Sequence, residues 1–138
     1  MTGAERPDLL GPVDLLAAAF QRRDLAAALA CFVPDNDISY TGSEAGESAE
    51  GRAAVAAVLA ELFARPEAYS WTIQSANVVA RAGIGYVACE LLGTVRADAG
   101  GTESFPYRLS GLLERTRSGW LWRACHGCEP TAAEGSIP

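Results

Sequence analysis

The sequence predicts an α+β domain, with helices in the first half of the chain and a curved antiparallel sheet in the second half. Up to about residue 64, apolar residues recur at the three- and four-residue spacing of a helix. From Tyr69 onward they follow the two-residue spacing of a strand. The breaks between the strand-like runs are short and turn-like, which favours consecutive hairpins. Such a sheet must bury one face on the helices, and a cone-shaped cavity can form where it curves around them.

The first two helices are expected before residue 34. Pro12 suits the first turn of a helix, and apolar residues follow at helical spacing as far as Phe20. Asp24 can cap the N-terminus of a second, short helix that ends near Phe32. Pro34 begins a polar turn that stops this helix. Two helices therefore precede the first strand.

One strand and a third helix complete the first half. Residues 38–42 predict a strand, and the polar, glycine-containing segment 43–51 predicts a loop. The third helix is expected from about Arg52 to Ala64, because its apolar residues form one stripe. Pro66 ends it. All three expected helices thus lie N-terminal to the main sheet.

Four long strands are expected in the second half, at about residues 70–81, 84–97, 104–117 and 120–128. The breaks between them are short and contain glycine, at residues 82–83, 98–101 and 117–119. Strands joined by such breaks pair as an antiparallel meander. The sequence thus predicts a single domain over residues 1–138, with its core at about 13–130.

The composition is that of a globular protein with an acidic balance. Apolar residues make up 49% and charged residues 20% of the chain, and the formal net charge is −6. An acidic chain argues against a nucleic-acid partner, because such binding comes mainly from basic side chains on phosphates. The sequence contains no lysine. This absence excludes Schiff-base chemistry and the phosphate-binding lysine of a P-loop.

No targeting or membrane segment is recognisable. Residues 1–12 lack the basic start and apolar run of a signal peptide, and no apolar stretch is long enough to span a bilayer. We therefore expect a cytoplasmic protein with no membrane partner, whose four cysteines are free thiols. Cys125 and Cys128 lie three apart on an expected strand and point to opposite faces, so neither a redox pair nor a zinc site is expected. We expect no cofactor and no metal ion.

Several segments resemble the SnoaL-like branch of the nuclear transport factor 2-like (NTF2-like) superfamily, in the same order along the chain. They are residues 32–42 (FVPDNDISYTG), 50–55 (EGRAAV), 107–109 (YRL), 119–123 (GWLWR) and 126–130 (HGCEP). The resemblance covers about residues 13–130 and implies an NTF2-like barrel, a cone-shaped α+β fold that forms a homodimer through its sheets. The superfamily includes polyketide cyclases, ketosteroid isomerases, dehydratases, epoxide hydrolases and non-catalytic binding or association domains. The resemblance therefore does not fix a reaction.

His126, the only histidine, is the first candidate for chemistry. Strand alternation places it on the same face as Trp120 and Trp122, and two indoles on one face indicate that this face points inward. An imidazole there can act as a general base or acid at neutral pH. The position of His126 resembles that of a histidine found in many SnoaL-like domains near the end of the last strand. We therefore predict that His126 lines an internal pocket and is the candidate catalytic residue. The alternative is a buried histidine with a structural role.

Six further side chains are candidates to bind a substrate. Glu90 lies in the apolar run 85–93, so it faces either outward on an exposed sheet face or inward in a perturbing environment. Tyr86 shares its face and can donate a hydrogen bond from its phenol. The remaining candidates are aromatic residues that can wall an apolar pocket or simply pack in the core. They are Tyr40, Trp71, Tyr107 and Trp122.

Two functional hypotheses remain open. The first is an enzyme that needs no cofactor: an isomerase, cyclase or dehydratase that acts on a small apolar carbonyl compound, with His126 transferring the proton. The second is a non-catalytic ligand-binding or dimerisation domain with the same fold. A carboxylate or phenol within hydrogen-bond reach of His126 in a deep cavity would favour the enzyme.

Overall fold

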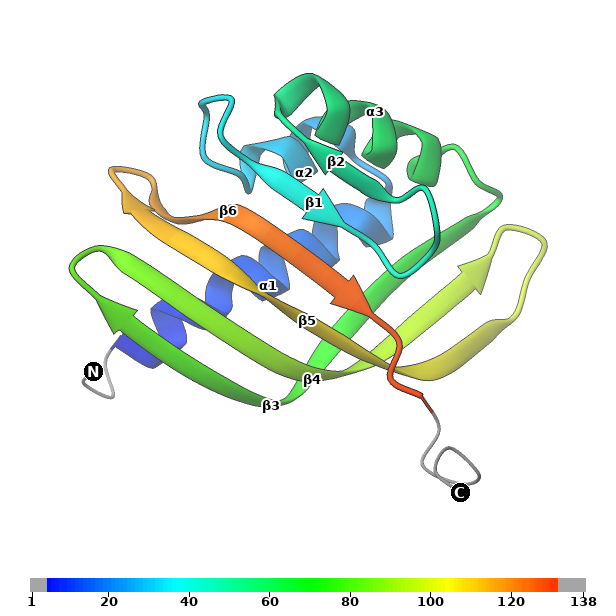
Figure 1. The fold of residues 1–138 in the computed structure, drawn as a ribbon. Coiled ribbons are helices and arrows are strands. Elements are labelled where there is room, and N and C mark those ends of the chain that lie inside the picture. Colours follow the sequence, from blue (N-terminus) through cyan, green and yellow to red (C-terminus); the bar gives the residue numbers. More distant parts are fainter. Residues whose placement is uncertain (1–4, 132–138) are drawn as a thin grey trace.

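Figure 1 shows the fold as a computed structural model, which describes residues 5–131. Within this range the chain forms three helices and six strands. The helices are α1 (Glu5–Arg22), α2 (Leu25–Ala30) and α3 (Arg52–Phe63), and the strands are β1 (Ser39–Thr41), β2 (Ser48–Glu50), β3 (Glu67–Arg81), β4 (Ile84–Ala97), β5 (Thr102–Thr116) and β6 (Gly119–Cys128). The α+β class is confirmed. None of the helices in the described range combines the length and apolar character of a membrane-spanning segment.

All six strands form one curved, open sheet in the order β2-β1-β6-β5-β4-β3. Neighbours are antiparallel except β1 and β6, which pair in parallel, so the sheet is mixed. The four long strands β3 to β6 pair in chain order, as the expected meander of hairpins does. Figure 1 shows these strands bending around α1, with α3 beside β1 and β2, and α2 packs against α1 and α3. The concave side of the sheet is therefore the side that holds the core.

Two tryptophans fasten α1 to the concave face of the sheet. Trp122 of β6 is fully buried, and its indole Nε1 donates a hydrogen bond to the carbonyl of Pro12 over 3.2 Å. The Nε1 atom of Trp71 in β3 donates to the carbonyl of Val13 over 3.0 Å. Each bond satisfies an indole N–H whose burial without a partner would cost about 1–3 kcal/mol. The core thus lies between α1 and the sheet.

The first helix begins earlier than expected, and Pro12 lies inside it rather than in its first turn. Proline lacks the N–H that would bond to the carbonyl four residues earlier, so the helix loses one bond there. Burial holds the extra turns in place. Leu9 is completely buried, and its Cδ2 atom lies 2.5 Å from the position that a β-carbon on Gly85 would take. The start predicted at Pro12 is wrong because this packing outweighs the local break.

The segment after β1 contains a short strand where the sequence indicates only a loop. In β2, Ala49 pairs with Tyr40 of β1. Ala49 is buried, and the residues on either side of it are exposed. Three residues are too few to give a periodic signal, so the strand is visible only through its pairing partner.

A β-bulge at Arg123 changes the alternation of side chains along β6. The register pairs on either side are Trp122 with Leu113 and Ala124 with Leu112. Arg123 is the extra residue, and everything after it is turned to the opposite face. Cys125 is therefore buried in the core, while His126 is exposed on the outer face. The expected inward orientation of His126 is wrong.

Candidate functional site

A cavity of about 320 Å³ opens at the end of the sheet where β3 begins and the β4–β5 hairpin turns. Its wall comes from the end of α1, from β1 and the loop after it, from the end of α3, from three long strands and from the segment after β6. The lining residues are Phe20, Tyr40, Ser43, Glu44, Glu47, Leu62, Arg65, Tyr69, Ser70, Trp71, Val95, Glu103, Ser104, Phe105, Tyr107 and Glu129. A volume of this size suits a small organic molecule.

Aromatic rings form one wall of the cavity. The ring centroid of Phe20 lies 5.0 Å from that of Trp71 and 6.3 Å from that of Tyr40. The Trp71 ring lies 6.1 Å from Tyr107, which lies 5.9 Å from Phe105. These separations are typical of packed aromatic pairs, so the wall offers firm, flat, apolar surface. Three of the candidate binding residues, Tyr40, Trp71 and Tyr107, are brought together here.

The phenols of Tyr40 and Tyr107 add polar atoms to this wall. Tyr40 is only 3% exposed, and Tyr107 is half-buried. Burial raises the pKa of both phenols, so both remain protonated at neutral pH and can donate a hydrogen bond. Neither hydroxyl bonds to another residue in the described part of the chain. Every fully buried side-chain oxygen or nitrogen in that part has a hydrogen-bond partner, so a hydroxyl without a partner is not fully buried. The two hydroxyls are therefore not sealed in protein but open to the cavity.

Glu47 places a carboxylate beside the two phenols. Burial is the largest cause of the raised pKa of both phenols, and the negative charge of Glu47 is a smaller one. Its Oε2 atom lies 3.3 Å from Nη2 of Arg65, and its Oε1 atom accepts a hydrogen bond from the N–H of Glu44 over 3.2 Å. Only 12% of its side chain is exposed. Gly42 makes room for it, because a side chain there would overlap the carboxylate.

Sequence reasoning missed Glu47 as a site residue. It lies in a polar segment with two other glutamates, Glu44 and Glu50, and no local pattern separates the three. The distinction arises only when the loop folds back and the end of α3 brings Arg65 against it. Gly42 was the one available signal, since glycine often marks a close approach of other groups to the backbone.

Four of the candidate residues lie away from the cavity. They are Tyr86, Glu90, Trp122 and His126. Trp122 is a core residue bonded to α1. Alternation along β4 turns Tyr86 and Glu90 outward, where Tyr86 is 47% exposed and Glu90 pairs with Arg108 over 2.8 Å. Glu90 therefore faces outward, as one of its two expected orientations has it. The prediction that Tyr86 lines the pocket is wrong.

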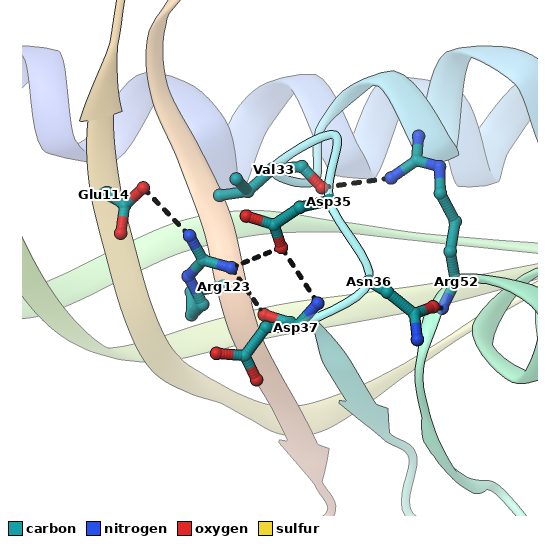
Figure 2. Close-up of polar contacts among 7 residues, drawn as sticks. All are labelled: Val33, Asp35, Asn36, Asp37, Arg52, Glu114 and Arg123. Carbon is teal, nitrogen blue, oxygen red and sulfur yellow. Dashed lines mark hydrogen bonds and ion pairs between the residues drawn. The ribbon is translucent and has the colours of Figure 1, made fainter.

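Arg123, the bulged residue of β6, is the centre of a separate polar cluster (Figure 2). Its guanidinium lies 2.6 Å from Oδ1 of Asp35 and 2.9 Å from Oε2 of Glu114, and it donates to the carbonyl of Asp37 over 2.7 Å. The hydrogen bond from Arg123 lowers the pKa of Asp35 below its ordinary value. A bulge re-aims a side chain, and here it directs Arg123 at these oxygens. The segment before β1 is thus fixed against β6.

Arg52 joins α3 to the same segment from the other side (Figure 2). Its Nη1 atom donates to the carbonyl of Val33 over 3.0 Å, and its backbone N–H donates to Oδ1 of Asn36 over 2.9 Å.

A second hollow of about 630 Å³ lies beside this cluster, lined by residues that include Asp37, Glu50 and Arg123. It lacks aromatic side chains among its lining residues. The aromatic cavity is therefore the candidate functional site.

Burial suppresses the reactivity of two cysteines, Cys31 and Cys125. Burial raises the pKa of the Cys31 thiol to about 11 and raises that of Cys125 further. A raised thiol pKa leaves little thiolate, which is the form that reacts or binds metal. No group of three or more histidine, cysteine, aspartate or glutamate side chains within the described residues could hold a metal ion.

The sequence profile of the SnoaL-like domain matches residues 12–127, most of the chain. The chain belongs to the SnoaL-like domain family. The match includes α1 from Pro12 onward and all six strands to Gly127, so it contains most elements that wall the aromatic cavity. No curated protein matches this SnoaL-like chain.

Solved structures share the fold of this SnoaL-like chain. An NTF2-like superfamily protein from Salmonella enterica serovar Typhimurium superposes with a TM-score of 0.80 at 11% identity, over 100% of this chain and 99% of its own. A proposed dehydratase of the NTF2-like family from Streptomyces avermitilis gives a TM-score of 0.79 at 15% identity, over 94% and 98% of the two chains. A ketosteroid isomerase-like protein from Erwinia carotovora atroseptica gives 0.74 at 20% identity, over 95% and 100%. At these identities the similarity establishes the fold alone.

Proposed function

We propose that the aromatic cavity binds a small apolar carbonyl compound and catalyses proton transfer next to its carbonyl group. The observation that carries this proposal is the grouping of two protonated phenols, Tyr40 and Tyr107, with the carboxylate of Glu47 around one cavity. His126 has no place in it, because its side chain is exposed on the opposite face of the sheet. Glu47 takes the role of the base.

The chemistry follows from the three side chains. The phenols of Tyr40 and Tyr107 donate hydrogen bonds to the carbonyl oxygen, which stabilises the negative charge that develops there. Glu47 accepts a proton from the carbon next to the carbonyl, and an enolate forms. Return of the proton to another carbon gives an isomer, attack of the enolate on a second carbonyl closes a ring, and loss of a neighbouring hydroxide gives a dehydrated product. The NTF2-like neighbours with dehydratase and isomerase descriptions support this range of reactions.

A second function, ligand binding without chemistry, is favoured by the contacts of Glu47. Both of its carboxylate oxygens are engaged, Oε2 by Arg65 and Oε1 by the N–H of Glu44. A carboxylate with both oxygens engaged has to give up one of these contacts before it can reach a proton on the ligand. In this alternative the phenols fix a ligand and no bond is broken.

Exchange of carbon-bound hydrogen separates the two functions. In D2O, the protein should accelerate deuterium uptake next to the carbonyl of 1-tetralone, a bicyclic aromatic ketone, as followed by proton NMR. Glu47→Gln should lower the accelerated rate at least about a hundredfold, since general bases contribute about 10²–10⁴. Binding of 1-tetralone without any accelerated exchange would sink the catalytic proposal and leave the binding function.

We also propose a homodimer formed through the outer face of the sheet. Large apolar side chains are exposed there: Val79, Ile84, Tyr86 and Leu92. The ion pair between Glu90 and Arg108 lies among them and could exchange partners across a two-fold axis. Light scattering on the purified chain of 14.5 kDa should give twice that mass, and Tyr86→Arg should give the monomer. A monomeric wild type would contradict the assembly.

A cytoplasmic location is part of the proposal. Cys31, Cys125 and Cys128 are free thiols in the structure. A reducing compartment keeps thiols in this state. Recovery of the protein in the soluble cytosolic fraction of its own cells would support this location, and recovery outside the cells would contradict it.

A further inference from the structure

Acidic side chains outnumber basic ones in the lining of the aromatic cavity. Its lining holds four glutamates and one arginine, a surplus of three formal negative charges. They are Glu44, Glu47, Glu103, Glu129 and Arg65. Arg65 is already engaged, with Nη1 3.0 Å from Glu44 and Nη2 3.3 Å from Glu47. Glu103 and Glu129 have no cationic partner among the residues that the structure describes. Both residues are exposed, so we call the part of the lining that they form the mouth of the cavity.

The aromatic wall also favours a positively charged ligand. The face of an aromatic ring carries negative potential and attracts a cation that lies over it. Four rings of the lining stand in sequence, Phe20, Trp71, Tyr107 and Phe105, with neighbouring centroids 5.0 to 6.1 Å apart. Phe105 lies two residues from Glu103 on β5, so ring and carboxylate occur side by side in the lining.

The negative net charge of the whole chain also favours a positively charged ligand. The formal net charge is −6, and the sequence contains no lysine. A cleft lined by one sign of charge concentrates that field and raises the local concentration of the opposite ion. An anionic ligand would meet repulsion at the mouth, and the one arginine of the lining is held by two glutamates.

We propose that the natural ligand carries one positive charge: an otherwise apolar, ring-containing carbonyl compound with a protonated amine at the end facing the mouth. This rests on the proposed function and adds the charge of the ligand to it. The carbonyl end lies against the hydroxyls of Tyr40 and Tyr107. The ammonium end lies near Phe105, between the carboxylates of Glu103 and Glu129.

Three probes with one bicyclic frame and different charges test this directly. They are 2-aminotetralin, a cation at neutral pH, 2-tetralol, which is neutral, and 1,2,3,4-tetrahydro-2-naphthoate, an anion. Isothermal titration should give the tightest binding for the amine and the weakest for the acid, with about a tenfold or greater difference between these two. The preference for the amine should shrink as salt is raised from 20 to 500 mM, because exposed carboxylates are screened (about 10 Å Debye length at 0.1 M).

A matched pair of variants assigns the preference to the mouth. Glu103→Gln combined with Glu129→Gln should lower the affinity for 2-aminotetralin about fivefold or more and leave that for 2-tetralol within about twofold. Glu50→Gln combined with Glu61→Gln removes the same charge at exposed positions outside the cavity lining. This control should leave all three affinities within about twofold, because screening limits distant surface charges.

The outcomes distinguish the two proposals. Equal affinities for the three probes, or tighter binding of the acid, would overturn the cationic ligand while leaving the cavity as a binding site. No binding of any probe, and none of 1-tetralone, would overturn the proposed function and this inference with it. An amine preference that survives Glu103→Gln with Glu129→Gln would also contradict the assignment to these two residues.

Discussion

The phenol of Tyr107 lies over the backbone of Gly127, at the place that a β-carbon would occupy. Gly127 is on β6 and pairs with Leu109 of β5, two residues from the tyrosine. Glycine at this position lets the ring lie across the neighbouring strand, with its hydroxyl at the cavity. The orientation of one donor in the candidate site therefore depends on the absence of a side chain on the next strand.

Gly127→Ala should displace Tyr107 and damage both stability and binding. The added methyl group would overlap the hydroxyl, and overpacking of this kind costs about 1–3 kcal/mol. We expect the free energy of unfolding in urea to fall by this amount and the affinity for 1-tetralone to fall with it. In a Tyr107→Ala background the same substitution should cost clearly less, since the group that it strikes is gone. Equal costs in both backgrounds would contradict the contact.

Gly11→Ala should have the opposite effect on stability. Gly11 lies within α1, and a β-carbon built there meets nothing within 4 Å outside its two chain neighbours. Alanine loses less backbone entropy than glycine in a helix interior, a difference of about 0.5–1 kcal/mol. The unfolding midpoint should therefore rise, with no change in ligand affinity. A lower midpoint would contradict this prediction and show that the clash of the new methyl group with the Pro12 ring outweighs the entropy gain.

The ion pair of Asp35 with Arg123 should make stability depend on pH. The hydrogen bond from Arg123 lowers the pKa of Asp35 in the folded protein below its unfolded value of about 4. The stabilisation is therefore fully present above pH 4 and is lost as the pH falls through the lowered folded value. Urea unfolding should show that Asp35→Asn destabilises more at pH 6 than at pH 2.5. In an Arg123→Gln background this pH dependence of the effect should largely disappear, and its persistence there would rule out Arg123 as the cause.

His126→Ala should leave ligand affinity unchanged within about twofold. The side chain is exposed, and the bulge at Arg123 turns it away from the cavity. Titration of 1-tetralone into both proteins checks this, with Trp71→Ala as the comparison that should lose affinity because Trp71 lines the cavity. A loss of fivefold or more in His126→Ala would mean that the imidazole acts on the cavity after all.

The architecture could be predicted from the sequence because its signals are long and local. The four strand-like runs are long, and glycine marks the hairpin breaks, so the order of β3 to β6 follows. Signals of one to three residues were insufficient. The strand β2 is too short to show a period, and Pro12 suggests a helix start that the burial of Leu9 overrides.

The candidate site was only partly predictable, for a related reason. Tyr40, Trp71 and Tyr107 could be chosen as aromatic residues on strands, and they do line the cavity. His126 was placed wrongly because a single extra residue reverses every later side chain, and the partners that draw Arg123 into the bulge are 9 and 88 positions away in the sequence. Contacts of that separation leave no local pattern.

The central claim is that the two open phenols hold the carbonyl group of a ligand in the aromatic cavity. The most direct measurement is isothermal titration of 1-tetralone into the wild type and into the variant that combines Tyr40→Phe with Tyr107→Phe. Removal of two hydrogen bonds worth about 0.5–1.5 kcal/mol each predicts about a fivefold or greater loss of affinity, with the wall of rings preserved. Equal affinity in the two proteins would contradict the claim.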